Sequence, residues 1–157
     1  MIKLPMVKKQ LEAFFKDNGY KYIYINKKNK KLSIPMYLLR LNVVSDTTRE
    51  IEEEINVMIT IFSSGTFIFI EAFNIYKLPE AKNILDIYKL INHLNSYSFP
   101  GKFILDNDNT VSYRCSIDYS NLDILCDKIL TPLINSIPPA YFIFLEELEK
   151  EKNTNGR

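Results

Sequence analysis

The first helix signal lies near the start of the chain. Between Met6 and Lys16, apolar residues recur at the spacing that places them on one helical face, at Val7, Leu11, Phe14 and Phe15. Asn18 and Gly19 follow, and both residue types tolerate the left-handed conformation that ends many helices. The pattern therefore predicts a helix over residues 6–16.

Four stretches rich in β-branched and aromatic residues come next, and they predict strands. Because proline has no N–H for a ladder, Pro35 is expected near a sheet edge or a strand start. A charged loop is expected from Ser45 to Glu54, and the turn Ser63–Gly65 joins the last two stretches into a hairpin. The predicted strands are Tyr20–Ile25, Ser33–Val44, Asn56–Phe62 and Thr66–Phe73.

The second half of the chain returns to helical periodicity, interrupted by one more hairpin. Ser120 with Asp123 resembles a capping box and predicts the start of a helix, which Pro132 should bend or end. Pro138 and Pro139 make a firmer break. The predicted elements are a helix from Pro79 to about Asn95, a hairpin of Lys102–Leu105 and Val111–Asp118 turning at Asp106–Asn109, the helix opening at Ser120, and a last helix from Ala140 to Lys150.

This order is α-β-β-β-β-α-β-β-α-α, which defines an α+β class with a mostly antiparallel sheet packed against helices. No glycine-, proline- or serine-rich stretch divides the 157 residues, so we predict a single domain over residues 1–150 and a flexible tail over 151–157.

Alternation along the predicted strands gives the sheet two apolar faces. Helices are expected to cover one face, and the other is expected to be covered by a second copy of the chain, by a partner protein or by the C-terminal helix. Tyr, Phe and Met are enriched at interface cores, which makes the aromatic face the candidate partner-binding surface. The aliphatic face is assigned Ile23, Ile25, Val57, Ile59, Ile61, Ile68 and Ile70, and the aromatic face Tyr22, Tyr24, Met58, Phe62, Phe67 and Phe69.

Charge and composition indicate the cellular location of the protein, but they do not identify its partner. The formal net charge is +1, which provides no long-range field to gather polyanions or to hold the chain on an acidic membrane. The start of the chain has no apolar run typical of a signal peptide, and no segment has about 18 uninterrupted apolar residues. Only two cysteines occur, too few for a disulfide scaffold. We expect a cytoplasmic protein without a membrane partner.

Candidate catalytic and metal-binding residues favour structural roles. The single histidine, His93, falls on the polar face of its predicted helix, and Cys115 and Cys126 alternate in phase with core residues. Asp106, Asn107 and Asp108 resemble the start of a calcium loop, but the glycine and the closing glutamate of that loop are missing. We therefore expect no catalytic residue, metal or cofactor.

A nucleic-acid interface is the alternative binding class. Gly65–Phe69 is similar in composition to an RNA-binding strand whose aromatic side chains stack on bases. Lysines of the predicted turn Lys27–Lys31 could contact phosphates. No basic residue precedes Gly65, and Thr66 stands where an aromatic residue is expected, so we expect nucleic acid not to be the partner.

Asn95 differs from its helical neighbours because its angle on the helix places it beside apolar residues. A polar group there needs hydrogen bonds, and the nearest backbone that lacks regular structure is the loop Ser96–Gly101. The sequence therefore predicts that Asn95 holds this loop.

The region from about Leu78 to Leu145 resembles the bacterial YbjN domain family. The residues that carry the resemblance are Ile91–Asn95, Phe99–Asp106 and Val111–Arg114, with Asn95, Gly101, Asp106, Tyr113 and Arg114 as its motif positions. That family is similar in fold to type III secretion chaperones, which are small, usually dimeric proteins that hold partner proteins and have no catalytic residues. The resemblance thus implies a non-catalytic protein-interaction module, chaperone-like or regulatory, whose partner is another protein or a second copy in a homodimer.

Overall fold

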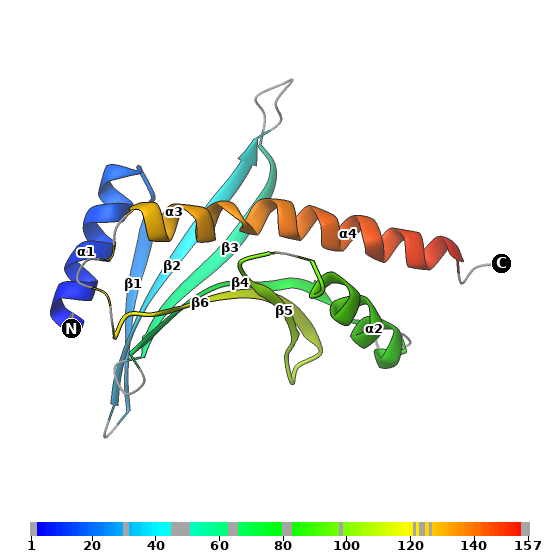
Figure 1. The fold of residues 1–157 in the computed structure, drawn as a ribbon, viewed down its shortest axis with the longest axis horizontal. Coiled ribbons are helices and arrows are strands. Elements are labelled where there is room, and N and C mark those ends of the chain that lie inside the picture. Colours follow the sequence, from blue (N-terminus) through cyan, green and yellow to red (C-terminus); the bar gives the residue numbers. More distant parts are fainter. Residues whose placement is uncertain are drawn as a thin grey trace.

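The chain folds around one antiparallel sheet of six strands in the order β1-β2-β3-β4-β6-β5 (Figure 1). The computed structural model describes residues 3–29, 32–44, 51–62, 66–79, 83–97, 99–120, 122, 125 and 127–154. Its elements are α1 (Leu4–Asp17), β1 (Tyr22–Asn29), β2 (Leu32–Val44), β3 (Ile51–Phe62), β4 (Phe67–Lys77), α2 (Ile84–Leu94), β5 (Lys102–Leu105), β6 (Thr110–Asp118), α3 (Asp127–Asn135) and α4 (Ile137–Thr154). The predicted α+β class and the predicted order of elements are confirmed.

The helices gather on one face of the sheet. α3 and α4 follow one another across the strands, α1 lies beside β1, and α2 packs against β5 and α4 (Figure 1). Between these helices and the sheet lies the core. Its largest fully buried side chains include Phe15 of α1, Tyr37 of β2, Tyr113 of β6 and Phe144 of α4.

The two ends of α1 illustrate how local chemistry sets an element. Pro5 lies in the first turn, where its missing N–H costs nothing. Gly19 has a φ of +71° just after the helix, and the Tyr20 N–H donates to the Phe15 carbonyl at 2.8 Å. This left-handed exit turns the chain into β1, as Asn18 and Gly19 predict.

Several predicted boundaries are wrong, and each has a local reason. β3 begins at Ile51, so Glu52–Glu54 belong to a strand and not to the predicted loop, whose first part, Ser45–Glu50, lies outside the described residues. α2 begins at Ile84 and not at Pro79, because the Asn83 side chain caps it by accepting from the Leu85 N–H at 3.0 Å. α4 starts at Ile137, with both prolines in its first turn, and continues to Thr154 beyond the expected end at Lys150.

The helix expected from Ser120 begins instead at Asp127. The Asp118 carboxylate accepts from the Ser120 N–H at 2.8 Å and closes a turn directly after β6. The Leu125 N–H donates to the Gln10 side chain of α1 at 3.0 Å, which ties this connection to the first helix. Asp123, the other half of the expected capping box, lies outside the described residues.

The stretch Asp127–Glu151, taken through α3 and α4 together, is apolar and long enough to cross a membrane by composition and length alone. A core helix of a soluble protein meets the same criterion, so the finding is weak evidence for a membrane. Here Leu130, Ile134, Ile137, Phe144 and Leu148 are buried against the sheet and its neighbouring helices.

Candidate functional site: the open face of the sheet

The face of the sheet opposite α1, α3 and α4, here called the open face, carries a band of apolar side chains. Directly paired residues of an antiparallel ladder point to the same side, so the register assigns every strand position to a face. No helix among the described residues lies over this band (Figure 1). Its apolar members are Ile23, Ile25, Met36, Leu38, Met58, Phe62, Phe67 and Phe69.

The band spans four strands, with the polar Thr60 between Met36 and Phe69. Ile23, Leu38 and Met58 form one cross-strand row over β1, β2 and β3. Phe62 pairs with Phe67, and its ring centroid lies 5.1 Å from that of Phe69. Ile23 remains 62% exposed and Phe67 40% exposed, so part of this apolar surface faces solvent in a single chain.

Two of the predicted partner-binding residues lie on the opposite side. Tyr24 pairs with the fully buried Tyr37, and Tyr22 pairs with the buried Leu39, which puts both tyrosines on the helix-covered face. The assignment of Tyr22 and Tyr24 to the same face as Met58, Phe62, Phe67 and Phe69 is therefore wrong. Ile23 and Ile25, which were assigned to the aliphatic face with Ile59, take their place on the open face.

The displaced tyrosines belong to an aromatic cluster under α1. The ring centroids of Tyr22 and Phe15 are 5.1 Å apart, and those of Tyr24 and Tyr37 are 5.2 Å apart. The Tyr37 hydroxyl donates to Glu12 of α1 at 2.8 Å, and burial, followed by this bond, raises the pKa of Tyr37 well above its usual range. The cluster thus fastens α1 to β1 and β2.

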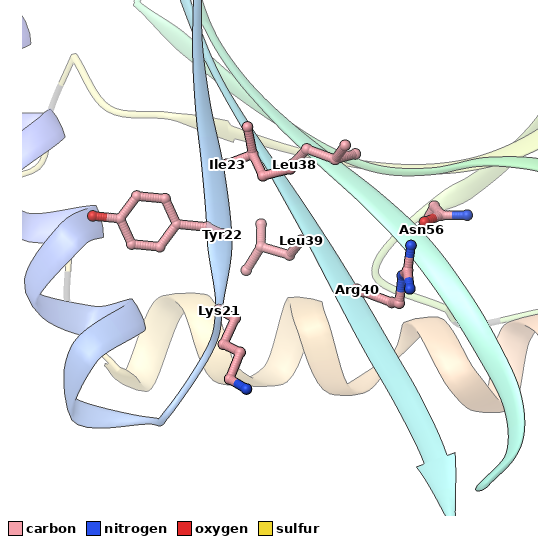
Figure 2. A pocket seen from close by; sticks show the side chains of 7 residues that line it. All are labelled: Lys21, Tyr22, Ile23, Leu38, Leu39, Arg40 and Asn56. Atoms are coloured by element: carbon pink, nitrogen blue, oxygen red, sulfur yellow. The ribbon is translucent and has the colours of Figure 1, made fainter.

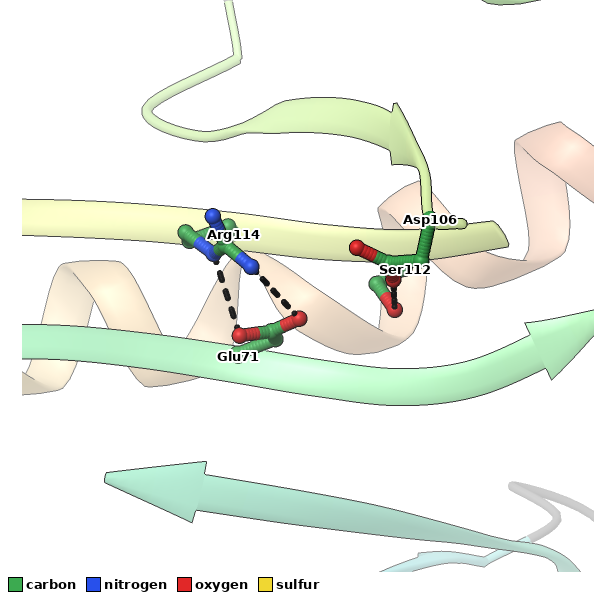
Figure 3. Close-up of polar contacts among 4 residues, drawn as sticks. All are labelled: Glu71, Asp106, Ser112 and Arg114. Carbon is green, nitrogen blue, oxygen red and sulfur yellow. Dashed lines mark hydrogen bonds and ion pairs between the residues drawn. The ribbon is translucent and has the colours of Figure 1, made fainter. Parts of the chain in front are cut away.

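A buried ion pair borders the apolar band at β4 and β6 (Figure 3). The Arg114 guanidinium donates two hydrogen bonds, each 3.0 Å, to the two carboxylate oxygens of Glu71. The Glu71 side chain is 10% exposed and that of Arg114 is 30% exposed. Arg114 also lies 5.3 Å from the centroid of the Phe69 ring. This fork is neutral overall, and it borders the band on β4, next to Phe69.

A depression opens beside the apolar band, at the end of the ladder between β1 and β2 (Figure 2). Their ladder ends at the pair Tyr22 and Leu39, whereas β2 remains paired with β3 at Arg40 and Asn56 and beyond. The resulting hollow has a volume of about 280 Å³. It is lined by Lys21, Tyr22, Ile23, Leu38, Leu39, Arg40 and Asn56.

The residues through which the chain resembles the YbjN family hold the hairpin of β5 and β6. The Gly101 N–H donates to the Tyr113 hydroxyl at 2.9 Å, and the Ser136 hydroxyl at the start of α4 lies 3.2 Å from the same oxygen. The Ser112 hydroxyl donates to Asp106 at 2.7 Å (Figure 3). With Arg114 in its ion pair, these positions are explained by architecture.

Asn95 also holds this hairpin, because its side chain forms hydrogen bonds with both backbone groups of one β5 residue. Its side-chain amide donates to the Phe103 carbonyl at 2.9 Å and accepts from the Phe103 N–H at 2.7 Å. The prediction that Asn95 holds the loop Ser96–Gly101 is wrong in its partner, because the backbone that Asn95 holds is that of Phe103 in β5.

Replacing Asn95 by alanine is expected to lower the free energy of unfolding by roughly 1–3 kcal/mol, because both backbone groups of Phe103 lose their partner in a largely buried site. His93→Ala is the matched control on the same helix. His93 is exposed and its Nε2 lies 3.1 Å from the hydroxyl of the exposed Tyr97, so we expect a change within about 0.5 kcal/mol. Urea denaturation of both variants measures the difference, and an unchanged midpoint for Asn95→Ala would contradict the anchor.

The other candidate residues follow their structural interpretation. Cys115 is buried, and burial raises the pKa of its thiol, which disfavours the reactive thiolate. Asp106–Asn109 forms the tight turn between β5 and β6, with Asn109 at a φ of +61°. No three His, Cys, Asp or Glu side chains in the described parts of the chain come together as a metal site. Cys126 lies outside them.

The residues proposed for the alternative nucleic-acid interface lie in different places in the structure. Phe67 and Phe69 lie on the open face, where Asp118 is the cross-strand partner of Phe67. Lys27 and Lys28 lie in β1, whereas Lys30, Lys31 and Gly65 lie outside the described residues. The carboxylate of Asp118 beside the aromatic rings would repel the phosphate backbone of a nucleic acid.

Sequence reasoning missed the depression and the partner of Arg114. Glu71 could have been found, because it is a single charge inside an otherwise apolar hairpin strand and such a charge needs a partner. No pattern in the sequence signals the depression, since it depends on where the ladder between β1 and β2 ends.

Comparison of the chain with known proteins found no match. No family model matches the chain, and no curated protein or solved structure matches it significantly. The resemblance to the YbjN family therefore stays a hypothesis.

Proposed function

We propose that this protein is a non-catalytic interaction module, chaperone-like or regulatory, that binds a protein partner through the open face of its sheet. The observation that carries the proposal is the apolar band from Ile23 to Phe69, which no described helix covers. A cytoplasmic setting is part of the same proposal.

The chemistry of the band supports binding of a protein. Aromatic rings and methionines supply contact area and adapt to the shape of a partner, and here Met36, Met58, Phe62 and Phe69 lie together. A partner that covers the band would remove the exposed parts of Phe67 and Ile23 from water. A second copy of the chain, as in a homodimer, is the simplest protein of this kind.

Photo-crosslinking at matched positions tests the proposal. A benzophenone side chain replaces Phe67 in one variant and Phe142 of α4 in another, and both phenylalanines are 40% exposed. We expect crosslinked protein at position 67 in the host cell and little at position 142, because only the first lies in the band.

The mass of the product separates the possible partners. A product of twice the chain mass identifies a second copy, and other masses identify a different protein. Equal crosslinking at both positions, or none at position 67, would contradict binding through the open face.

A further inference from the structure

We infer that the depression between β1 and β2 anchors a segment of the partner protein in which an apolar side chain stands next to a carboxylate. The inference rests on the proposed function, because it takes the open face as the docking surface. It adds the chemistry of what docks there.

The interior of the depression is apolar. From the open face it is lined by Leu38, which is half-buried, and by Ile23, which is the most exposed of the large apolar side chains in the described part of the chain. Ile23 and Leu38 lie at one end of the hollow in Figure 2. A volume of about 280 Å³ accommodates one large apolar side chain with the backbone that carries it.

The other end of the depression is basic. Lys21 lies there on the β1 side, and Arg40 projects beside Asn56 across the gap (Figure 2). No acidic residue is among those that line the hollow. The nearest charge partner of Arg40 is Glu54 at 3.4 Å, and the two side chains are 63% and 48% exposed, so solvent screens this pair strongly.

Arg40 also lines a neighbouring hollow of about 310 Å³, between the end of α1, β2 and the junction of α3 and α4. Asn18, Asn42 and Asn135 are among the residues that line it. Arg40 therefore borders two hollows. An arginine can hold a carboxylate through two parallel hydrogen bonds, so an apolar residue followed by Glu or Asp matches this surface in shape and charge.

The test is an NMR titration of the whole isotope-labelled chain with three capped dipeptides. The probe is acetyl-Phe-Glu-amide, and its controls are acetyl-Phe-Gln-amide, which lacks the charge, and acetyl-Ser-Glu-amide, which lacks the ring. We expect the probe to shift the NMR signals of the backbone amides of Lys21, Ile23, Leu38 and Arg40. We expect the affinity of each control dipeptide to be at least about fivefold lower than that of the probe.

Matched variants separate the depression from general surface effects. Arg40→Gln is compared with Lys89→Gln, because both cations belong to exposed ion pairs on different elements. Ile23→Ser is compared with Leu85→Ser, because these side chains are 62% and 61% exposed. We expect about fivefold weaker probe binding for Arg40→Gln and for Ile23→Ser, and unchanged binding for the two α2 variants.

Three outcomes overturn the inference: no localised shifts, equal binding of the Gln control, or unchanged binding by Arg40→Gln. Decanoate that binds more tightly than the dipeptide would assign the depression to a lipid-like anion and would also overturn it. If crosslinking at position 67 is observed and the dipeptide titration fails, the proposed function stands and only this inference is wrong. If there is no crosslinking at position 67, both the proposed function and this inference are wrong.

Discussion

Gly101→Ala is expected to lower the free energy of unfolding by about 3 kcal/mol, because a methyl group has no room at this position. A Cβ there would lie 2.6 Å from the Tyr113 ring, 2.7 Å from the Cys115 sulfur and 2.8 Å from the Arg114 carbonyl oxygen. The last contact is with backbone in β6, so a side-chain rotation cannot relieve it. The displacement would also strain the hydrogen bond from the Gly101 N–H to the Tyr113 hydroxyl.

Gly19→Ala provides the control for this prediction. No atom lies within 4 Å of a Cβ built at Gly19, and its φ of +71° is the only source of strain. We expect a cost of about 1 kcal/mol from the left-handed backbone alone. Urea denaturation compares the two variants, and adding Cys115→Ala to Gly101→Ala should restore part of the loss. A Gly101→Ala variant no less stable than Gly19→Ala would show that the hairpin can move away.

The sequence predicts most elements of the sheet because local chemistry sets them. β5 begins and ends at the predicted residues, and β6 differs by one residue at its start. Pro35 lies within β2, and the ladder between β2 and β3 begins at the next residue, Met36. The proline therefore lies at the end of that ladder, because it has no N–H to donate.

The orientation of β1 could not be predicted, because both of its faces are apolar. An alternating strand reveals its buried side only where one side is polar, and Tyr22 to Ile25 offer no such contrast. β2 and β3 do offer it, since Arg40 and Asn56 mark the open face in adjacent strands. The pairing of Tyr24 with Tyr37 then fixes β1 from outside, through tertiary contacts.

The candidate site was predicted in part for the same reason. Met58, Phe62, Phe67 and Phe69 were correctly grouped, because they alternate within one tight hairpin. To join them to the β1 residues, the registers of two further ladders are needed, β1 with β2 and β2 with β3. The depression beside Arg40 depends on where one of those ladders ends, which hydrophobic alternation does not encode.

Arg114→Met is expected to lower the free energy of unfolding by about 2–4 kcal/mol. The substitution leaves the carboxylate of Glu71, only 10% exposed, without the two hydrogen bonds that compensate its removal from water. Lys102 faces Arg114 across β5 and β6, but its ammonium already donates to the Asn95 carbonyl at 2.7 Å. Its release to Glu71 would break that bond, so we expect little compensation.

Arg40→Met is the matched control, because it breaks the other arginine–glutamate pair of the same sheet face. With side chains 63% and 48% exposed, that pair should contribute within about 0.5 kcal/mol. The double variant Glu71→Leu with Arg114→Met gives the decisive comparison, since replacing both charges by apolar groups removes the uncompensated carboxylate. We expect it to recover most of the stability lost in Arg114→Met. A double variant as unstable as the single one would mean that Arg114 acts mainly through packing on Phe69, and the ion pair would not be the element that stabilises this edge of the open face.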